Sequence, residues 1–344
     1  MSAIWYIAAA VGIVCALGAV ALRNFSRRRR LYDHPNERSG HAQPVPRLGG
    51  ISIAFSAMAG TLVAAAAGVP AVPALVPVVI SALLMTFVGL LDDVRPLGAA
   101  AKFCGQLLAV AVLMGTWPLF ASREPWWVVL IAAGWLVTYT NQFNFMDGSD
   151  GLAAGVALIQ VASLGTITMI LDRPDIAALA LLVAAAAAGF LIVNYPPASI
   201  FMGDSGSHFL GFTLALIAAL AWRAGVHPAV VLAVMSPFVF DATFTLLARA
   251  FRGEALTHAH RSHLYQRLLD SGWPAPAVAW AYYAWCLTAG VSAWYVVRLT
   301  AQSWASGTVL LMLNAVPVAV FMWIVMRRER RRSRDGSATS VLRS

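Results

Sequence analysis

The stretch WWVVLIAAGWLVTYTNQFNFMDGSDGLAAGVALIQVASLGTITMIL (126–171) holds two long apolar runs separated by the polar turn NFMDGSDG (144–151). Each run is close to the roughly 20 helical residues that cross the hydrocarbon core of a bilayer. Ionisable groups at a membrane are costly unless they face water or a partner. The polar turn is therefore either a hydrated loop or part of a site, and the rest of the chain decides between these two interpretations.

The composition of the whole chain is that of a membrane protein. Of its 344 residues, 60% are hydrophobic and only 11% are charged, whereas soluble domains are about one quarter charged. The apolar runs predict an all-α polytopic bundle of about eleven transmembrane helices, forming a single domain over residues 1–344. The expected spans are 4–22, 49–68, 74–91, 103–120, 126–143, 151–171, 176–193, 208–222, 228–249, 274–297 and 307–326.

Lysine and arginine are distributed unequally between the two ends of these spans. If residues 27–30 are cytoplasmic, all but four of the 24 basic residues lie on that side, the exceptions being Arg123, Arg173, Arg223 and Arg298. This positive-inside pattern predicts an outside N-terminus and a cytoplasmic C-terminus. The basic tail at 327–344 then faces anionic lipid, so the net charge of +9 does not indicate a nucleic-acid partner.

Acidic residues collect on the same predicted cytoplasmic face, although they come from three different loops. Mg²⁺ prefers oxygen ligands and is usually held by one or two carboxylates together with water and substrate phosphates. Basic groups that could offset substrate charge lie nearby in sequence, at Lys102 and in HAHRSHLYQR (258–267). Such a set suits phosphoryl transfer from a nucleotide-linked donor to a lipid-borne acceptor. The acids are Asp92, Asp93, Asp147, Asp150 and Asp204.

Each of these segments also has a purely structural interpretation. The Asp92–Asp93 pair could be a solvated helix end, the glycine-rich turn a mere change of chain direction, and Asp204 a helix cap. The histidine- and arginine-rich loop could bind anionic headgroups. Asp241 lies deep in an expected span, where either a functional role or a buried structural hydrogen bond would explain it.

Five segments in matching order, from residue 33 to residue 268, resemble the polyprenyl-phosphate N-acetylhexosamine-1-phosphate transferase family, which is glycosyltransferase family 4. The resemblance implies a multi-pass enzyme of the cell inner membrane with its active site in the cytoplasm. It implies transfer of N-acetylhexosamine 1-phosphate from a UDP-sugar to undecaprenyl phosphate, with release of UMP. The segments are DHPNERSGHAQPVPRLGG (33–50), GLLDDVRPLGAAAKF (89–103), NQFNFMDGSDGLAAG (141–155), NYPPASIFMGDSGSHFLG (194–211) and HAHRSHLYQRL (258–268).

The resemblance also implies roles for individual residues. Asp92, Asp93 and Asp147 match the catalytic acids, of which the first two lie beside the lipid phosphate. Asp204 and Asn144 match the ligands of Mg²⁺, which Mn²⁺ can replace. The matching substrate-binding residues are Lys102 at the pyrophosphate, Asp150, Asn194 and Phe201 at the nucleotide, and His258, His260, Arg261 and His263 near the sugar and phosphates.

The histidine loop separates two branches of this family. HAHRSH lacks the consecutive histidines of the phospho-MurNAc-pentapeptide transferase of peptidoglycan synthesis, and it is more similar to members that initiate O-antigen or capsule synthesis. The peptidoglycan enzyme stays the first alternative, and an ion-coupled secondary transporter the second. The expected partners are the UDP-sugar, undecaprenyl phosphate, membrane lipids and a second copy of the chain in a homodimer.

Overall fold

The computed structural model describes residues 2–33, 43–72, 75–116, 125–255, 261–299 and 303–341. Most of these residues are helical, and each of the eleven expected spans falls on a helix. The helices are α1 (Ser2–Arg29), α2 (Gly50–Ala66), α3 (Leu75–Val94), α4 (Ala99–Thr116), α6 (Trp126–Phe145), α7 (Leu152–Ile170), α8 (Pro174–Asn194), α9 (Gly203–Arg223), α10 (Pro228–Phe251), α11 (Leu264–Asp270), α12 (Ala275–Leu299) and α13 (Trp304–Val341).

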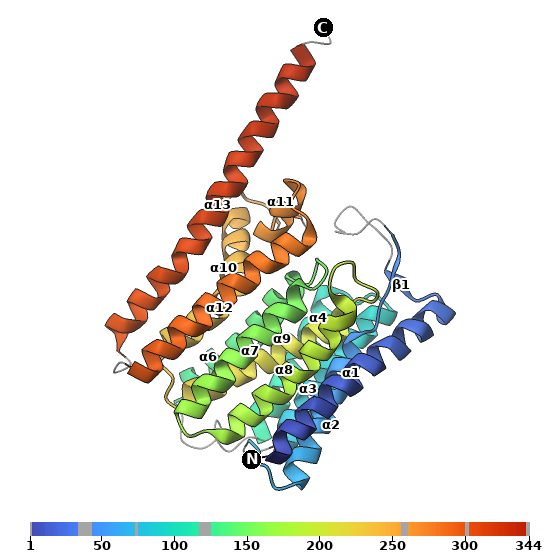
Figure 1. Cartoon of the computed structure of the whole chain (residues 1–344), viewed down its shortest axis with the longest axis vertical. Coiled ribbons are helices and arrows are strands. Elements are labelled where there is room, and N and C mark those ends of the chain that lie inside the picture. Colours follow the sequence, from blue (N-terminus) through green and yellow to red (C-terminus); the bar gives the residue numbers. More distant parts are fainter. Residues whose placement is uncertain are drawn as a thin grey trace.

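Seven of the described helices are long and apolar enough to cross a membrane, which confirms a polytopic helical membrane protein. They are α1, α3, α7, α8, α9, α10 and α13, while α2 and α4 are shorter apolar helices. The number of eleven crossings therefore stays a prediction. The N-terminus and the tip of α13 lie at opposite ends of the bundle (Figure 1), as the predicted topology requires, although the side that faces the cytoplasm also stays a prediction.

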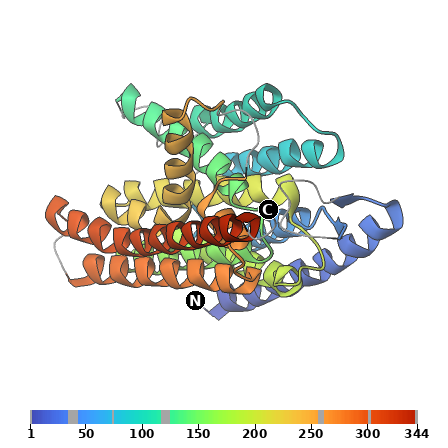
Figure 2. The ribbon, with the colours of Figure 1, turned by 90° about the horizontal axis from the view of Figure 1, so that it is seen from above.

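Helix α9 is the centre of the bundle. Every residue from 205 to 221 is buried, and the helix packs against α3, α6 and α2. The expected span at 208–222 was too short at its start, because the first turn of α9 is polar: Gly203, Asp204 and Ser205 depress the local hydropathy. The view from above shows α12 and α13 side by side at one edge of the bundle, next to α10 (Figure 2).

Two glycines let neighbouring backbones touch α9. A Cβ on Gly89 of α3 would lie 2.1 Å from the carbonyl oxygen of Asp204, and a Cβ on Gly50 of α2 would lie 2.1 Å from the backbone nitrogen of Gly206. Both distances are far below van der Waals contact. The close approach of α3 brings its acidic end to the polar first turn of α9.

The segment between α1 and α2 reaches the same end of α9. A small antiparallel hairpin pairs Tyr32–Asp33 (β1) with Val45–Pro46 (β2), which is a minor departure from the all-α expectation. Beyond β2, the backbone N–H of Gly49 donates to the carbonyl of Phe201 at 2.9 Å, and that of Gly50 donates to the carbonyl of Met202 at 2.8 Å. The start of α9 is thus in contact with α3 and with the segment that leads into α2.

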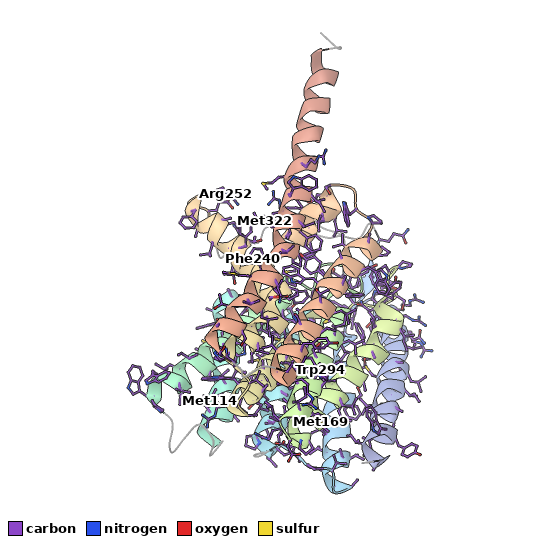
Figure 3. All side chains as sticks on the ribbon, turned by 60° about the vertical axis from the view of Figure 1, so that its left-hand side comes forward. Met114, Met169, Phe240, Arg252, Trp294 and Met322 are labelled. Atoms are coloured by element: carbon purple, nitrogen blue, oxygen red, sulfur yellow. The ribbon has the colours of Figure 1, made fainter. Side chains whose placement is uncertain are left out.

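Helix α10 bends away from the bundle at its far end. Pro237 lies inside this helix and removes one helical hydrogen bond, which favours a bend. Helix α10 packs against α13, whereas Arg252 at the tip of α10 lies where this helix leans away from α13 in Figure 3. The end of α10 therefore leans away from the bundle, whereas α11 packs against α13, α12 and α10.

Replacement of Gly89 by alanine is expected to separate α3 from α9. The added methyl group has no room against the backbone of Asp204, and overpacking of this kind costs about 1–3 kcal/mol. A thermal melt of the purified protein in detergent should show a lowered Tm. Gly134→Ala is the matched control, because a Cβ at this helical position meets nothing within 4 Å; equal Tm values for the two variants would contradict the close contact.

Candidate active site

The carboxylate of Asp93 joins α3 to the start of α9. Its Oδ1 accepts the backbone N–H of Asp204 at 2.9 Å, and its Oδ2 accepts that of Ser205 at 3.0 Å. Only 6% of Asp93 is exposed. These two N–H groups belong to the first turn of α9, where helical donors have no partner within the helix. Asp93 therefore holds the turn that bears Asp204, and the catalytic role predicted for Asp93 itself stays a prediction.

Lys102 lies between two other carboxylates. Its Nζ is 3.1 Å from Oδ2 of Asp92 and 3.3 Å from Oδ2 of Asp204. The second oxygen of Asp92 accepts the backbone N–H of Leu97 at 2.6 Å, so the turn between α3 and α4 holds this side chain in place. Asp92 and Lys102 are both partly exposed, unlike Asp93, and can meet a ligand.

Asn144, at the end of α6, completes the surroundings of Asp204. Its Nδ2 donates to Oδ1 of Asp204 at 3.0 Å and to Oγ of Ser207 at 2.8 Å. On the other side, Nδ1 of His208 is 2.8 Å from the carbonyl oxygen of Asp204. The structure thus brings Asp92, Lys102, Asn144 and Asp204 together, as expected from the sequence.

Asp147 contributes further negative charge from the turn after α6. Burial raises the pKa of this carboxyl group, and the nearby charges of Asp204 and Asp93 raise it further. A cation that approaches a carboxyl group with a raised pKa stabilises its charged form and lowers this pKa again. Acids from the ends of α3 and α6 and from the start of α9 therefore form one cluster, in which Lys102 forms ion pairs with Asp92 and Asp204.

A second group of expected residues organises the loop before α9. Oδ2 of Asp150 accepts the backbone N–H of Ala198 at 2.9 Å. Asn194 accepts the N–H of Gly151 at 3.1 Å and donates to the carbonyl of Ile200 at 3.0 Å. These bonds join the glycine-rich turn to the loop that carries Phe201, which is partly exposed. The three expected nucleotide-binding residues therefore lie on two connected segments.

The histidine loop is only partly described. His258 and His260 lie outside the described residues. Arg261 pairs with Asp270, at 2.9 Å from Nη2 to Oδ1, and His263 is only 2% exposed, with Nδ1 3.5 Å from Oδ1 of Asp241. The predicted contact of these two residues with substrate stays a prediction.

Three contributing residues were not expected at this site. Ser207 and His208 follow Asp204 by three and four positions on a buried helix, so the helical period places them on the face of Asp204. Tyr265, whose hydroxyl group donates to the carbonyl of Phe145 at 3.2 Å, could not be found in this way. Its partner is a backbone atom more than a hundred residues earlier in the chain.

The cluster has the donor chemistry of a magnesium site. Asp204 supplies carboxylate oxygens, and the amide of Asn144 supplies an oxygen in addition to the NH₂ group that faces Asp204. Among the described residues, no group of three or more His, Cys, Asp or Glu side chains is arranged to hold a metal ion. A small number of protein ligands fits Mg²⁺, because this ion usually keeps several waters and takes oxygens from substrate phosphates.

Comparison with known proteins connects this cluster to a family. The profile of glycosyl transferase family 4 matches residues 75–221, which run from the start of α3 almost to the end of α9. A probable undecaprenyl-phosphate N-acetylglucosaminyl 1-phosphate transferase of Bacillus subtilis (strain 168) is 31% identical over 256 residues, covering 70% of each chain. The chain belongs to glycosyl transferase family 4.

Two other relatives show how far the similarity extends. A decaprenyl-phosphate N-acetylglucosaminephosphotransferase of Mycobacterium leprae (strain TN) is 28% identical, with 80% of this chain and 79% of the relative aligned. A phospho-N-acetylmuramoyl-pentapeptide-transferase of Moorella thermoacetica is 29% identical, with 74% and 85% aligned. The family expected from the five segments is therefore confirmed, and the matched residues 75–221 include the entire acid cluster.

The two neighbouring acids of α3 are expected to respond differently to amide substitution. Asp93→Asn places an NH₂ group against a buried backbone N–H, which costs about 1–3 kcal/mol and should lower the Tm in detergent. Asp92→Asn keeps an oxygen for Leu97 at a partly exposed position, so it should melt close to wild type. If Asp92→Asn lowers the Tm as much as Asp93→Asn does, the structural role assigned to Asp93 is wrong.

Proposed function

We propose that the protein transfers N-acetylhexosamine 1-phosphate from a UDP-sugar to undecaprenyl phosphate, with release of UMP, at a Mg²⁺-dependent site in the cytoplasm. The observation that carries this proposal is the meeting of Asp92, Asp147 and Asp204 with Lys102 and Asn144 at one end of a membrane bundle. The family relatives are named as transferases of sugar phosphates to polyprenyl phosphates.

The charges of the cluster suit a reaction between two phosphates. Both the donor pyrophosphate and the acceptor phosphate are anionic, so they can approach the acids only together with cations. Asp204 and Asn144 would hold Mg²⁺, which when bound would offset the charge of the donor phosphates. Lys102 is a partly exposed cation that can turn from its two carboxylates to the pyrophosphate.

The proposed reaction is a direct displacement at phosphorus. An oxygen of the lipid phosphate forms a bond to the β-phosphorus of the UDP-sugar, while the bond from that phosphorus to the bridging oxygen of UMP breaks. The acceptor phosphate is largely ionised near neutral pH, so Asp92 needs to orient the nucleophile more than to remove a proton. Positioning and charge stabilisation supply most of the catalysis in this class.

The donor's base would lie at the second group of residues. Oδ2 of Asp150 is engaged by Ala198, and the carboxylate can accept one more hydrogen bond, from the N3–H of uracil. Phe201 follows on the adjoining loop and offers a ring face to the base. Asn194 holds these two segments together, so its loss would loosen the nucleotide site even without direct contact.

The relatives favour transfer of N-acetylglucosamine 1-phosphate over the phospho-MurNAc-pentapeptide transfer of peptidoglycan synthesis. Both N-acetylglucosamine-phosphate transferases described above align with this chain over at least 70% of its length, which supports UDP-N-acetylglucosamine as the donor. The product would then be the polyprenyl-diphosphate-linked sugar on which a surface glycan is built in the inner membrane. The phospho-N-acetylmuramoyl-pentapeptide-transferase relative keeps the peptidoglycan reaction as the second candidate.

The first test is UMP release by protein purified in detergent, with undecaprenyl phosphate and a panel of UDP-N-acetylhexosamines and UDP-MurNAc-pentapeptide. We expect release that requires both the lipid and Mg²⁺ and stops in EDTA. Asp204→Ala should reduce the rate by about 10²- to 10³-fold, as for other preorganised electrostatic groups.

Asp175→Ala is the control for that variant. It removes another carboxylate that is bonded to a cation, Arg173, but at the start of α8, whereas the site lies near the end of this helix. Wild-type activity in Asp204→Ala would contradict the proposed site. Ion-coupled uptake by reconstituted protein, without any UMP release, would instead favour the transporter.

A further inference from the structure

Asp241 is a fully buried carboxylate that takes no part in the acid cluster. It lies on α10 with 0% exposure. Its Oδ1 accepts the backbone N–H of Leu264 at 2.7 Å, and its Oδ2 accepts that of Tyr265 at 3.1 Å and the hydroxyl of Tyr282 at 2.5 Å. A buried carboxylate is tolerated only when its oxygens are matched in this way.

These bonds fasten the first residues of α11 to the bundle. Asp241 lies ten residues before the outward-leaning end of α10, and it bonds the backbone of the first two residues of α11. His263 adds a further contact, since its ring stacks between those of Phe145 and Tyr265, at centroid distances of 5.9 and 6.1 Å. His263 and the start of α11 are therefore in contact with both α10 and the end of α6.

Tyr265 connects Asp241 to the turn of the active site, because its backbone is bonded to Asp241 and its side chain reaches the turn. Its hydroxyl group donates to the carbonyl of Phe145 at 3.2 Å, the residue directly after Asn144. The same hydroxyl oxygen lies 2.1 Å from where a Cβ on Gly148 would be, the residue directly after Asp147. The hydroxyl group of Tyr265 thus lies against the turn at the residue that follows Asn144 and at the residue that follows Asp147.

We propose that Asp241 is a positioning residue, which through Tyr265 holds the turn at 144–148 in the conformation that binds the donor. It touches no reacting atom. With the turn already ordered, the UDP-sugar does not have to supply the free energy of ordering it, and preorganisation of this kind appears as affinity. The inference rests on the proposed function only in the identity of this donor.

The chemistry of the site requires a carboxylate at position 241. Each oxygen accepts a buried backbone N–H group, from Leu264 at Oδ1 and from Tyr265 at Oδ2, and a backbone N–H cannot turn to accept a hydrogen bond instead. Asparagine keeps one acceptor oxygen and turns an NH₂ group toward the other donors. Asp241→Asn therefore retains the size of the side chain but loses one of the two hydrogen bonds to the backbone of α11.

The experiment compares Asp241→Asn with wild type and with Asp175→Asn, the same substitution at an ion-paired carboxylate of α8. Hydrogen–deuterium exchange should become faster in peptides covering 261–270 and 143–150 in Asp241→Asn alone. The KM for UDP-N-acetylglucosamine should rise about tenfold, the equivalent of one hydrogen bond to a charged group. The KM for undecaprenyl phosphate and kcat should stay within about twofold, which a general loss of structure would not produce.

Two milder variants keep the inference testable if Asp241→Asn does not fold. Tyr282→Phe removes one bond to Asp241, and Tyr265→Phe removes the bond to Phe145; each should raise the donor KM about threefold. Unchanged donor KM and unchanged exchange at 143–150 in these variants would overturn the inference. If wild-type protein releases no UMP, the proposed function fails, but exchange at 143–150 still decides the role of Asp241.

Discussion

The carboxylate of Asp93 accepts the first backbone N–H groups of α9, and the geometry of the site depends on these two hydrogen bonds. They can form because Gly89 lets α3 approach the backbone of Asp204 without an intervening side chain. In so close a contact there is no room for water, so a buried acid and unpaired helical donors must satisfy each other. With the backbone of Asp204 held in this way, its side chain reaches Lys102 and Asn144.

The rest of the cluster follows from charge. Asp92, Asp147 and Asp204 come from separate segments, and like charges at such distances oppose one another unless cations intervene. Lys102 offsets part of this repulsion, and the remainder is consistent with the Mg²⁺ that we propose to bind together with its anionic substrate. The fold thus gathers negative charge, only partly neutralised by Lys102, at one end of the bundle. A soluble nucleotide-sugar and a lipid-borne phosphate can both reach this end.

The sequence predicts the helices well and the contacts between them poorly. Apolar runs locate each long helix, because burial in lipid or protein requires them, but hydropathy misses the start of α9, whose first turn is polar. The five segments predict that Asp92, Lys102, Asn144 and Asp204 meet. They do not distinguish Asp92 from Asp93, since the difference depends on the rotation of α3 against α9, and the partners of Asp93 are backbone atoms that any residue would supply.

Asp93 and Asp241 make the same kind of hydrogen bonds at two places in the bundle. Each is buried within a helix of the bundle, and each uses both oxygens to hold the backbone at the start of another helix, α9 in one case and α11 in the other. From the sequence, the resemblance assigns Asp93 to catalysis, and for Asp241 a functional role and a buried structural hydrogen bond both stay open. Their hydrogen bonds show that both carboxylates hold backbone in place: Asp93 holds the turn that bears Asp204, and Asp241 holds the start of α11, from which Tyr265 contacts the turn after Asn144.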